Sequence, residues 1–180
     1  MGRWSLGLHV LGSSLGGGFT GLILGLLGSL FRALVPSSSD LLVAAFLIVL
    51  SYGVVVDLGI PHIPRMDSGR QTTGNWLCSI GTKGALFGWG IDLGNSFTTR
   101  LPYHVVAALP AYCFLLAGPL SGAAVLGLYG LARSLIVTAT ILAAPAHHAD
   151  TCRAIAGQHE VLRGLVAGAG LAAVILFLAR

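Results

Sequence analysis

Long apolar segments recur along this chain, and short polar loops separate them. A helix of about 20 apolar residues crosses the roughly 30 Å hydrocarbon core of a bilayer. The composition agrees, since 55% of the residues are hydrophobic and only 9% are charged, whereas soluble domains carry about 25% charged residues. The sequence therefore predicts an all-α fold, a polytopic integral membrane helical bundle that forms one transmembrane domain over residues 1–180 with the lipid bilayer around it.

We expect five transmembrane helices, or six if the third divides, over residues 5–34, 41–57, 84–118, 120–144 and 161–178. The third run would be roughly 50 Å long as one helix, which exceeds a single straight crossing. Gly90, Gly94 and Pro102 are weak points within it. The run is therefore expected to be broken, either as one tilted helix preceded by a re-entrant piece or as two short half-helices.

The charged loops predict an orientation. With five spans, most basic residues fall on one side, which places the N-terminus in the cytoplasm. The richer side holds Arg3, Arg65, Arg70, Lys83, Arg153 and Arg163, and the other side holds Arg32 and Arg180. The net charge of +4 is spread over single residues, so no basic patch predicts a nucleic-acid partner.

Two glycine stripes predict close helix contacts. Gly17, Gly21 and Gly25 recur every four residues in the first segment, and Gly164 and Gly168 do so in the last. Small residues at this spacing let helix backbones approach in membranes. The run 16–18 is three successive glycines, which either belongs to this packing seam or breaks the helix, as in half-helices that line a transport site.

Arg133 lies in the middle of the fourth apolar segment, where its side chain cannot easily reach water. It needs a partner, and Asp92 and Asp57 are the carboxylates in or near the membrane. One interpretation is a static ion pair or a bond to freed backbone carbonyls. The other is contact with an anion or another substrate, since ionisable groups inside a membrane commonly mark functional sites.

Asp92, Asn95, Thr98 and Thr99 recur at three- and four-residue spacing and would form one polar stripe on a helix. With Arg133 they form a candidate midplane site for a substrate or ion. The alternative is hydrogen bonding between helices that stabilises the bundle. His104 is a further candidate, as a polar contact or part of a proton path.

The remaining candidates rest on residue type. Cys113 is either a redox thiol or a small apolar filler. The loop residues His147, His148, Asp150, Cys152 and His159 are possible metal ligands by type, but their spacing matches no zinc pattern and suits a solvated loop. No catalytic motif points to an enzyme, and the sequence requires no cofactor.

The middle of the chain, about residues 60–140, combines a proline-bounded loop with three short motifs. These are Arg70-Gln71 with Trp76, Gly90-Ile91-Asp92-Leu93-Gly94 followed by Thr98-Thr99, and Tyr129-Gly130-Leu131-Ala132-Arg133. In this order they resemble small bacterial membrane proteins of the CcdA/DsbD-like and LysE-like group. The resemblance implies two inverted three-helix halves and transport of small solutes or reducing equivalents. It also implies a location in the plasma (inner) membrane of a bacterium. CcdA-type electron carriers have a membrane cysteine in each half, whereas only Cys113 lies in an expected span here.

Two main functions follow as hypotheses. The first is a multi-pass carrier for a small solute or reducing equivalents, in which one half of the bundle rocks against the other. The second is a non-catalytic accessory or assembly subunit that packs against membrane partners or further copies of itself. Inward glycine stripes favour the first, and outward stripes favour the second. A membrane enzyme that uses His104 or the loop histidines is a third hypothesis.

Overall fold

The computed structural model describes residues 3–35, 38–59, 76–95, 103–143 and 159–178, and this part of the chain is all-helical. The elements are α1 (Arg3–Leu34), α2 (Ser39–Asp57), α3 (Trp76–Gly94), the 3-10 helix η1 (His104–Ala107), α4 (Ala108–Leu115), α5 (Pro119–Ala143) and α7 (His159–Leu178). The predicted all-α class is confirmed for these residues.

Three helices are long and apolar enough to cross a membrane, over Leu6–Leu34, Ser39–Asp57 and Pro119–Thr140. Many of their large apolar side chains point outward, including Phe19, which is 66% exposed, and Ile48, which is 69% exposed. Lipid chains would cover such side chains favourably, whereas their exposure to water would be unfavourable. These helices are consistent with an integral membrane protein, and the full count of five spans stays a prediction.

The third apolar run is broken, and it contains two separate helices. α3 ends at Gly94 and η1 begins at His104, so the structure favours the two half-helices. α3 begins at Trp76, before the expected start of the third span at residue 84. Its first turn is separated by a kink at Gly81, whose φ of 69° suits glycine. The straight part, 82–94, is only about 20 Å long.

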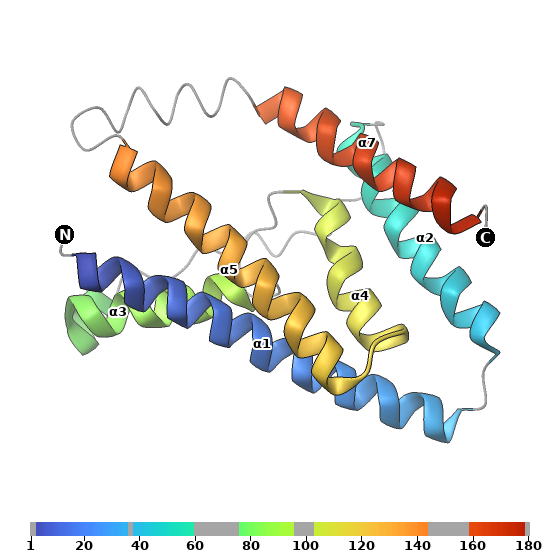
Figure 1. Ribbon diagram of the computed structural model, residues 1–180, viewed down its shortest axis with the longest axis horizontal. Coiled ribbons are helices and arrows are strands. Elements are labelled where there is room, and N and C mark those ends of the chain that lie inside the picture. The colour runs from blue at the N-terminus through green and yellow to red at the C-terminus, as the bar shows by residue number, and fades with distance from the viewer. Residues whose placement is uncertain (1–2, 36–37, 60–75, 96–102, 144–158, 179–180) are drawn as a thin grey trace.

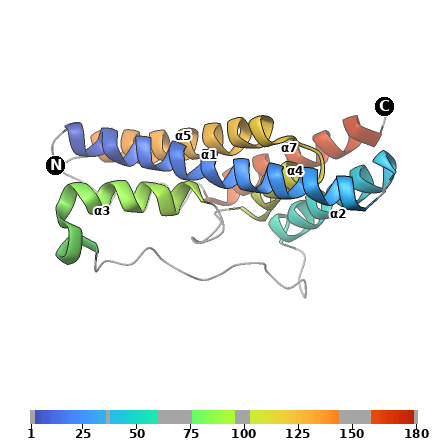
Figure 2. The same cartoon turned by 90° about the horizontal axis from the view of Figure 1, so that it is seen from below.

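The helices form two groups. α1 lies between α3 and α5 and packs extensively against both (Figures 1 and 2). We call these three helices the seam unit. α2 packs against η1, α4 and α7, and these elements form the core unit. In Figure 1 α4 stands between α5 on one side and α2 with α7 on the other.

Glycines hold the seam unit together through direct backbone contact. A Cβ added at most of these positions would lie closer than 3.0 Å to backbone atoms of the next helix, a contact that real Cβ atoms essentially never make. On α1, Gly12 and Gly16 face Phe87 and Ile91 of α3, Gly17 and Gly21 face Leu126 and Gly122 of α5, and Gly25 faces Gly118. The predicted seam at residues 17, 21 and 25 is therefore confirmed and points inward.

The glycine run 16–18 does not break the helix, because α1 continues from Arg3 to Leu34. That alternative was wrong for a physical reason. Gly16 packs on α3 and Gly17 packs on α5, so close contact on two sides offsets the low helix propensity of glycine.

The core unit packs through larger side chains. Phe46 and Leu50 of α2 and Ala108 of α4 are its buried centre. Tyr112 lies edge-on to Phe46 with ring centroids 6.0 Å apart, a geometry that aromatic pairs favour. One glycine, Gly53 of α2, allows η1 to approach, since a Cβ there would lie 2.6 Å from the Cα atom of Val105.

Candidate functional site

The inner end of α3 lies against the middle of α1. Gly90 and Gly94 are buried, and added Cβ atoms would collide with the backbone at His9 and Ser13 of α1. The backbone N–H of Asn95 donates to the carbonyl oxygen of Ile91, and α3 ends at this turn. The seam that binds α3 to α1 thus positions the end of a half-helix inside the bundle.

Arg133 lies at this same end. Its Nη1 donates to the carbonyl oxygen of Leu93 over 3.1 Å. The last carbonyls of a helix have no partner in their own helix and carry partial negative charge, so a guanidinium is favourable there. Arg133 is half-buried and stands about 20 Å along α5 from Pro119. This contact agrees with the backbone-carbonyl interpretation of Arg133, and contact with a substrate stays a prediction.

Asp92 is half-buried in the last turn of α3, and it also has an interaction partner. An ion pair between Asp92 and Arg133 stays a prediction. The stripe that was expected to run on to Thr98 and Thr99 cannot continue on one helix, because α3 ends at Gly94. These two threonines lie outside the described residues.

Asn95 is tied to α1 through Thr20, which the sequence analysis did not single out. The Thr20 Oγ1 atom lies 2.8 Å from Oδ1 of Asn95 and 2.9 Å from the carbonyl oxygen of Gly16. A hydroxyl has one proton, so Thr20 donates to one of these acceptors at a time. A cavity of about 230 Å³ adjoins this pair and is lined mainly by apolar side chains, including Leu15, Phe19 and Ile91.

The inner end of the other half-helix is held by Asp57. Its Oδ1 accepts the backbone N–H of His104 over 2.9 Å, and its Oδ2 accepts the N–H of Val105 over 2.9 Å. Nδ1 of the His104 ring lies 3.1 Å from Oδ1. The carboxylate is 4% exposed. It satisfies the unpaired N–H groups of η1 and complements the positive end of the helix dipole.

This contact bears on two expectations. Asp57, which was expected as a possible partner for Arg133, bonds to His104 and Val105, and Gly53, one turn earlier on α2, lets η1 approach. His104 is a polar contact, as one of its two interpretations proposed. Its Nε2 is buried and has no hydrogen-bond partner among the described residues, and the proton path stays a prediction.

Arg32 is the charged residue whose role sequence reasoning missed. Arg32 lies near the end of the first expected span and was used only as an orientation signal, yet its guanidinium donates to the carbonyl oxygens of Phe114 and Ala117 over 2.8 and 2.7 Å. The carbonyl of Phe114 lies in the last turn of α4, and that of Ala117 lies two residues beyond its end. The available signal was that Arg32, four residues before Pro36, lies within a helix and not in a loop.

Arg133, Asp57 and Arg32 each contact a helix end of opposite partial charge. Arg133 meets the C-terminal end of α3, Asp57 meets the N-terminal end of η1, and Arg32 meets the C-terminal end of α4. Each has the sign that opposes the partial charge of the helix end it touches. In a low-dielectric interior such pairing is strong, because no water competes for the orphaned backbone groups.

Cys113 is fully buried where α4 crosses α5, and its thiol lies 3.7 Å from the carbonyl oxygen of Gly122. This placement favours the small apolar filler over the redox thiol. No group of three potential metal ligands occurs among the described residues. The candidate ligands His147, His148, Asp150 and Cys152 lie outside those residues, as does the side chain of His159.

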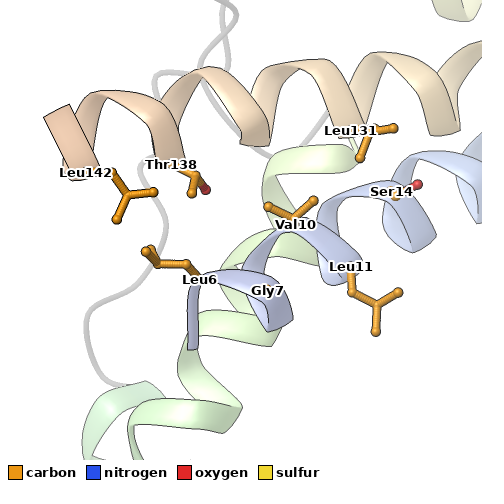
Figure 3. A pocket seen from close by; sticks show the side chains of 8 residues that line it. All are labelled: Leu6, Gly7, Val10, Leu11, Ser14, Leu131, Thr138 and Leu142. Atoms are coloured by element: carbon orange, nitrogen blue, oxygen red, sulfur yellow. The ribbon is translucent and has the colours of Figure 1, made fainter. Parts of the chain in front are cut away.

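Two larger cavities are apolar. Figure 3 shows one of about 510 Å³ between the diverging ends of α1 and α5, with Leu6, Val10, Thr138 and Leu142 around it. The other, of about 410 Å³, lies between α2, α4 and α7. Among the described residues, no charged side chain lines either cavity, whereas Arg133, Asp57 and Arg32 lie at helix ends.

The comparisons with known proteins add no relative: no protein-family model, no curated protein and no solved structure matches this chain.

Proposed function

We propose that this chain is an integral membrane carrier for a small solute, with its binding site around the break in the third apolar run. The observation that carries the proposal is the pair of half-helices whose inner ends lie inside the bundle. Broken helices of this kind commonly form substrate and ion sites in transporters, where helix ends and freed carbonyls contact the cargo. The site residues in this proposal are Asp92, Asn95, Thr98, Thr99, Arg133 and His104.

The charges at the two ends support a polar cargo. A cation, Arg133, stands at the end of α3 and a carboxylate, Asp57, stands at the start of η1. The cavity beside Thr20 and Asn95 offers an amide and a hydroxyl nearby. Reducing equivalents are the less favoured cargo, because Cys113 is sealed between helices. A cytoplasmic N-terminus, which rests on the basic loop residues, and a plasma-membrane location, which rests on the resemblance to bacterial membrane proteins, complete the proposal.

The test is a ligand screen on purified protein in detergent. Candidate solutes are inorganic phosphate, sulfate, amino acids, dicarboxylates and monovalent cations. A solute that binds only the folded state raises the apparent melting temperature. The stabilising solute should lose its effect in Asn95→Leu and in Arg133→Lys, since lysine cannot reproduce the planar guanidinium contact. The control Thr140→Val, an exposed hydroxyl bonded to its own helix, should keep it.

Uptake of the same solute into proteoliposomes then separates a carrier from a simple binding protein. Accumulation that depends on wild-type protein and fails in Asn95→Leu supports the carrier. Binding without any uptake would count against transport.

A second candidate function is an accessory subunit of a membrane complex. The observation that favours it is the stripe at Gly164 and Gly168 on α7, where an added Cβ would meet nothing within 4 Å. This stripe points outward, unlike the one on α1, and outward stripes suit a helix of another subunit. Mild-detergent purification with mass spectrometry decides between the two. Larger membrane proteins in stoichiometric amounts, lost in Gly168→Leu, would favour the subunit over the carrier.

A further inference from the structure

The two units meet at one end of α4. Among the described residues, the extensive contacts between the seam unit and the core unit all involve this helix. Its flank packs on Phe46 and Leu50 of α2, while its C-terminal end is held by α1 and α5. Figure 1 shows this end of α4 above the crossing of α1 and α5.

Four contacts hold this end of α4 in place. They involve the last turn of the helix and the residues just beyond it. The two guanidinium nitrogens Nη1 and Nη2 of Arg32 donate to the carbonyl oxygens of Phe114 and Ala117. Gly28 touches the backbone of Phe114, and a Cβ there would overlap it. The rings of Phe31 and Phe114 lie 5.6 Å apart. Cys113 is fully buried against Gly122 of α5.

The opposite end of the same short segment is fixed to α2. Gly53 and Asp57 bind the first residues of η1. η1 and α4 together span 104–115, about 18 Å. The segment formed by η1 and α4 therefore packs against α2 at its N-terminal end and along one side. At its C-terminal end it packs against α1 and α5 of the seam unit.

We infer that the C-terminal end of α4 is a pivot, about which the core unit rotates as a rigid body against the seam unit. Close-packed interiors do not deform continuously, so motion concentrates where two packed bodies meet over a small contact. The inference deepens the proposed function and rests on it for its purpose, since rotation of one half against the other is the movement a carrier requires.

Distances between spin labels in lipid nanodiscs test the pivot. The between-unit pair is Ile48 in α2 and Leu128 in α5, which are 69% and 65% exposed. The within-unit control is Leu30 in α1 with the same Leu128. Labels are placed in a background with Cys78→Ser and Cys152→Ser, and Cys113 is retained because it is fully buried and contributes to the pivot. We expect a between-unit distance distribution roughly two times wider than the control distribution, or one with two maxima.

A pivot variant adds a second measurement. Arg32→Gln should widen the between-unit distribution further and leave the control unchanged, and Arg32→Lys serves if the glutamine variant does not fold. Equal, narrow distributions for both pairs would overturn the pivot. Solute-induced stabilisation with narrow distributions would keep the binding site and reject the pivot. A wide between-unit distribution without any binding solute would keep the pivot and reject the carrier.

Discussion

The seam unit and the core unit are held together by different means. In the seam unit, backbones touch directly, and Gly21 of α1 faces Gly122 of α5 with no side chain between them. In the core unit, Phe46, Leu50 and Tyr112 fill the space between helices, and one carboxylate fastens the ends. This difference shows that the tolerance of a helix contact to substitution depends on whether backbone atoms or side-chain atoms form it. A backbone contact cannot relax around an extra methyl group, whereas a side-chain contact can repack.

The largest predicted effect tests the seam. Gly21→Leu places a side chain into the Gly122 backbone, so the helices must separate. We expect a loss of more than about 3 kcal/mol of unfolding free energy, at the upper end of overpacking effects, seen as aggregation in size-exclusion chromatography or a much lower melting temperature. Gly168→Leu is the matched control, because that glycine faces open space. Equal behaviour of the two variants would refute the packed seam.

The next effect tests the carboxylate of the core unit. Asp57→Asn keeps the shape but leaves one acceptor oxygen for two backbone N–H groups, so a buried donor loses its partner. The expected cost is about 1–3 kcal/mol. Asp40→Asn, at the exposed start of the same helix, should cost less than about 1 kcal/mol. Guanidinium or thermal unfolding of the two variants measures the difference, and similar losses would contradict the role of Asp57.

A smaller effect tests the contact between the units. Arg32→Lys retains the charge but cannot reach two carbonyls as a fork. We expect a loss of about 1–2 kcal/mol, while Lys83→Gln, an exposed residue, should change stability by less than about 0.5 kcal/mol. Thermal unfolding in one detergent compares them. If Arg32→Lys left the unfolding free energy unchanged, a point charge would be sufficient at this helix end.

The smallest effect isolates a hydrogen bond within the seam. Ser13 is fully buried and donates to the carbonyl oxygen of Gly130 over 2.8 Å. Ser13→Ala removes the bond without adding volume and should cost about 0.6 kcal/mol, the average for bonds between membrane helices. Thr140→Ala, whose hydroxyl bonds within its own helix, is the control. A cost for Ser13→Ala near that of Gly21→Leu would show that hydrogen bonds, and not close approach, dominate the seam.

Local features of the fold could be read from the sequence. The apolar runs predicted where α1, α2 and α5 lie, and Gly94 marked the end of α3. The four-residue glycine spacing predicted a seam at Gly21, because helix periodicity places such residues on one face. These are short-range properties, which neighbouring residues determine together.

The partners of the charged residues could not be read in the same way. Arg32 bonds to residues 82 and 85 positions away, and Asp57 bonds to His104, 47 positions away. Such contacts depend on how broken helices are placed in space, and composition does not encode this. Arg133 illustrates the limit: its need for a partner was evident, but the carbonyl of Leu93 became one only because α3 ends there.

The central position of α1 has a consequence for biosynthesis. α1 is made before α5, and α5, which covers one side of its glycine seam, begins 85 residues after α1 ends. At about 5–20 residues per second, synthesis of that intervening chain takes roughly 4–17 s. During this interval α5 is not yet available to cover the glycine backbone of α1. α1 therefore becomes fully packed long after its own synthesis, and a ribosome that stalls before α5 would leave this seam uncovered.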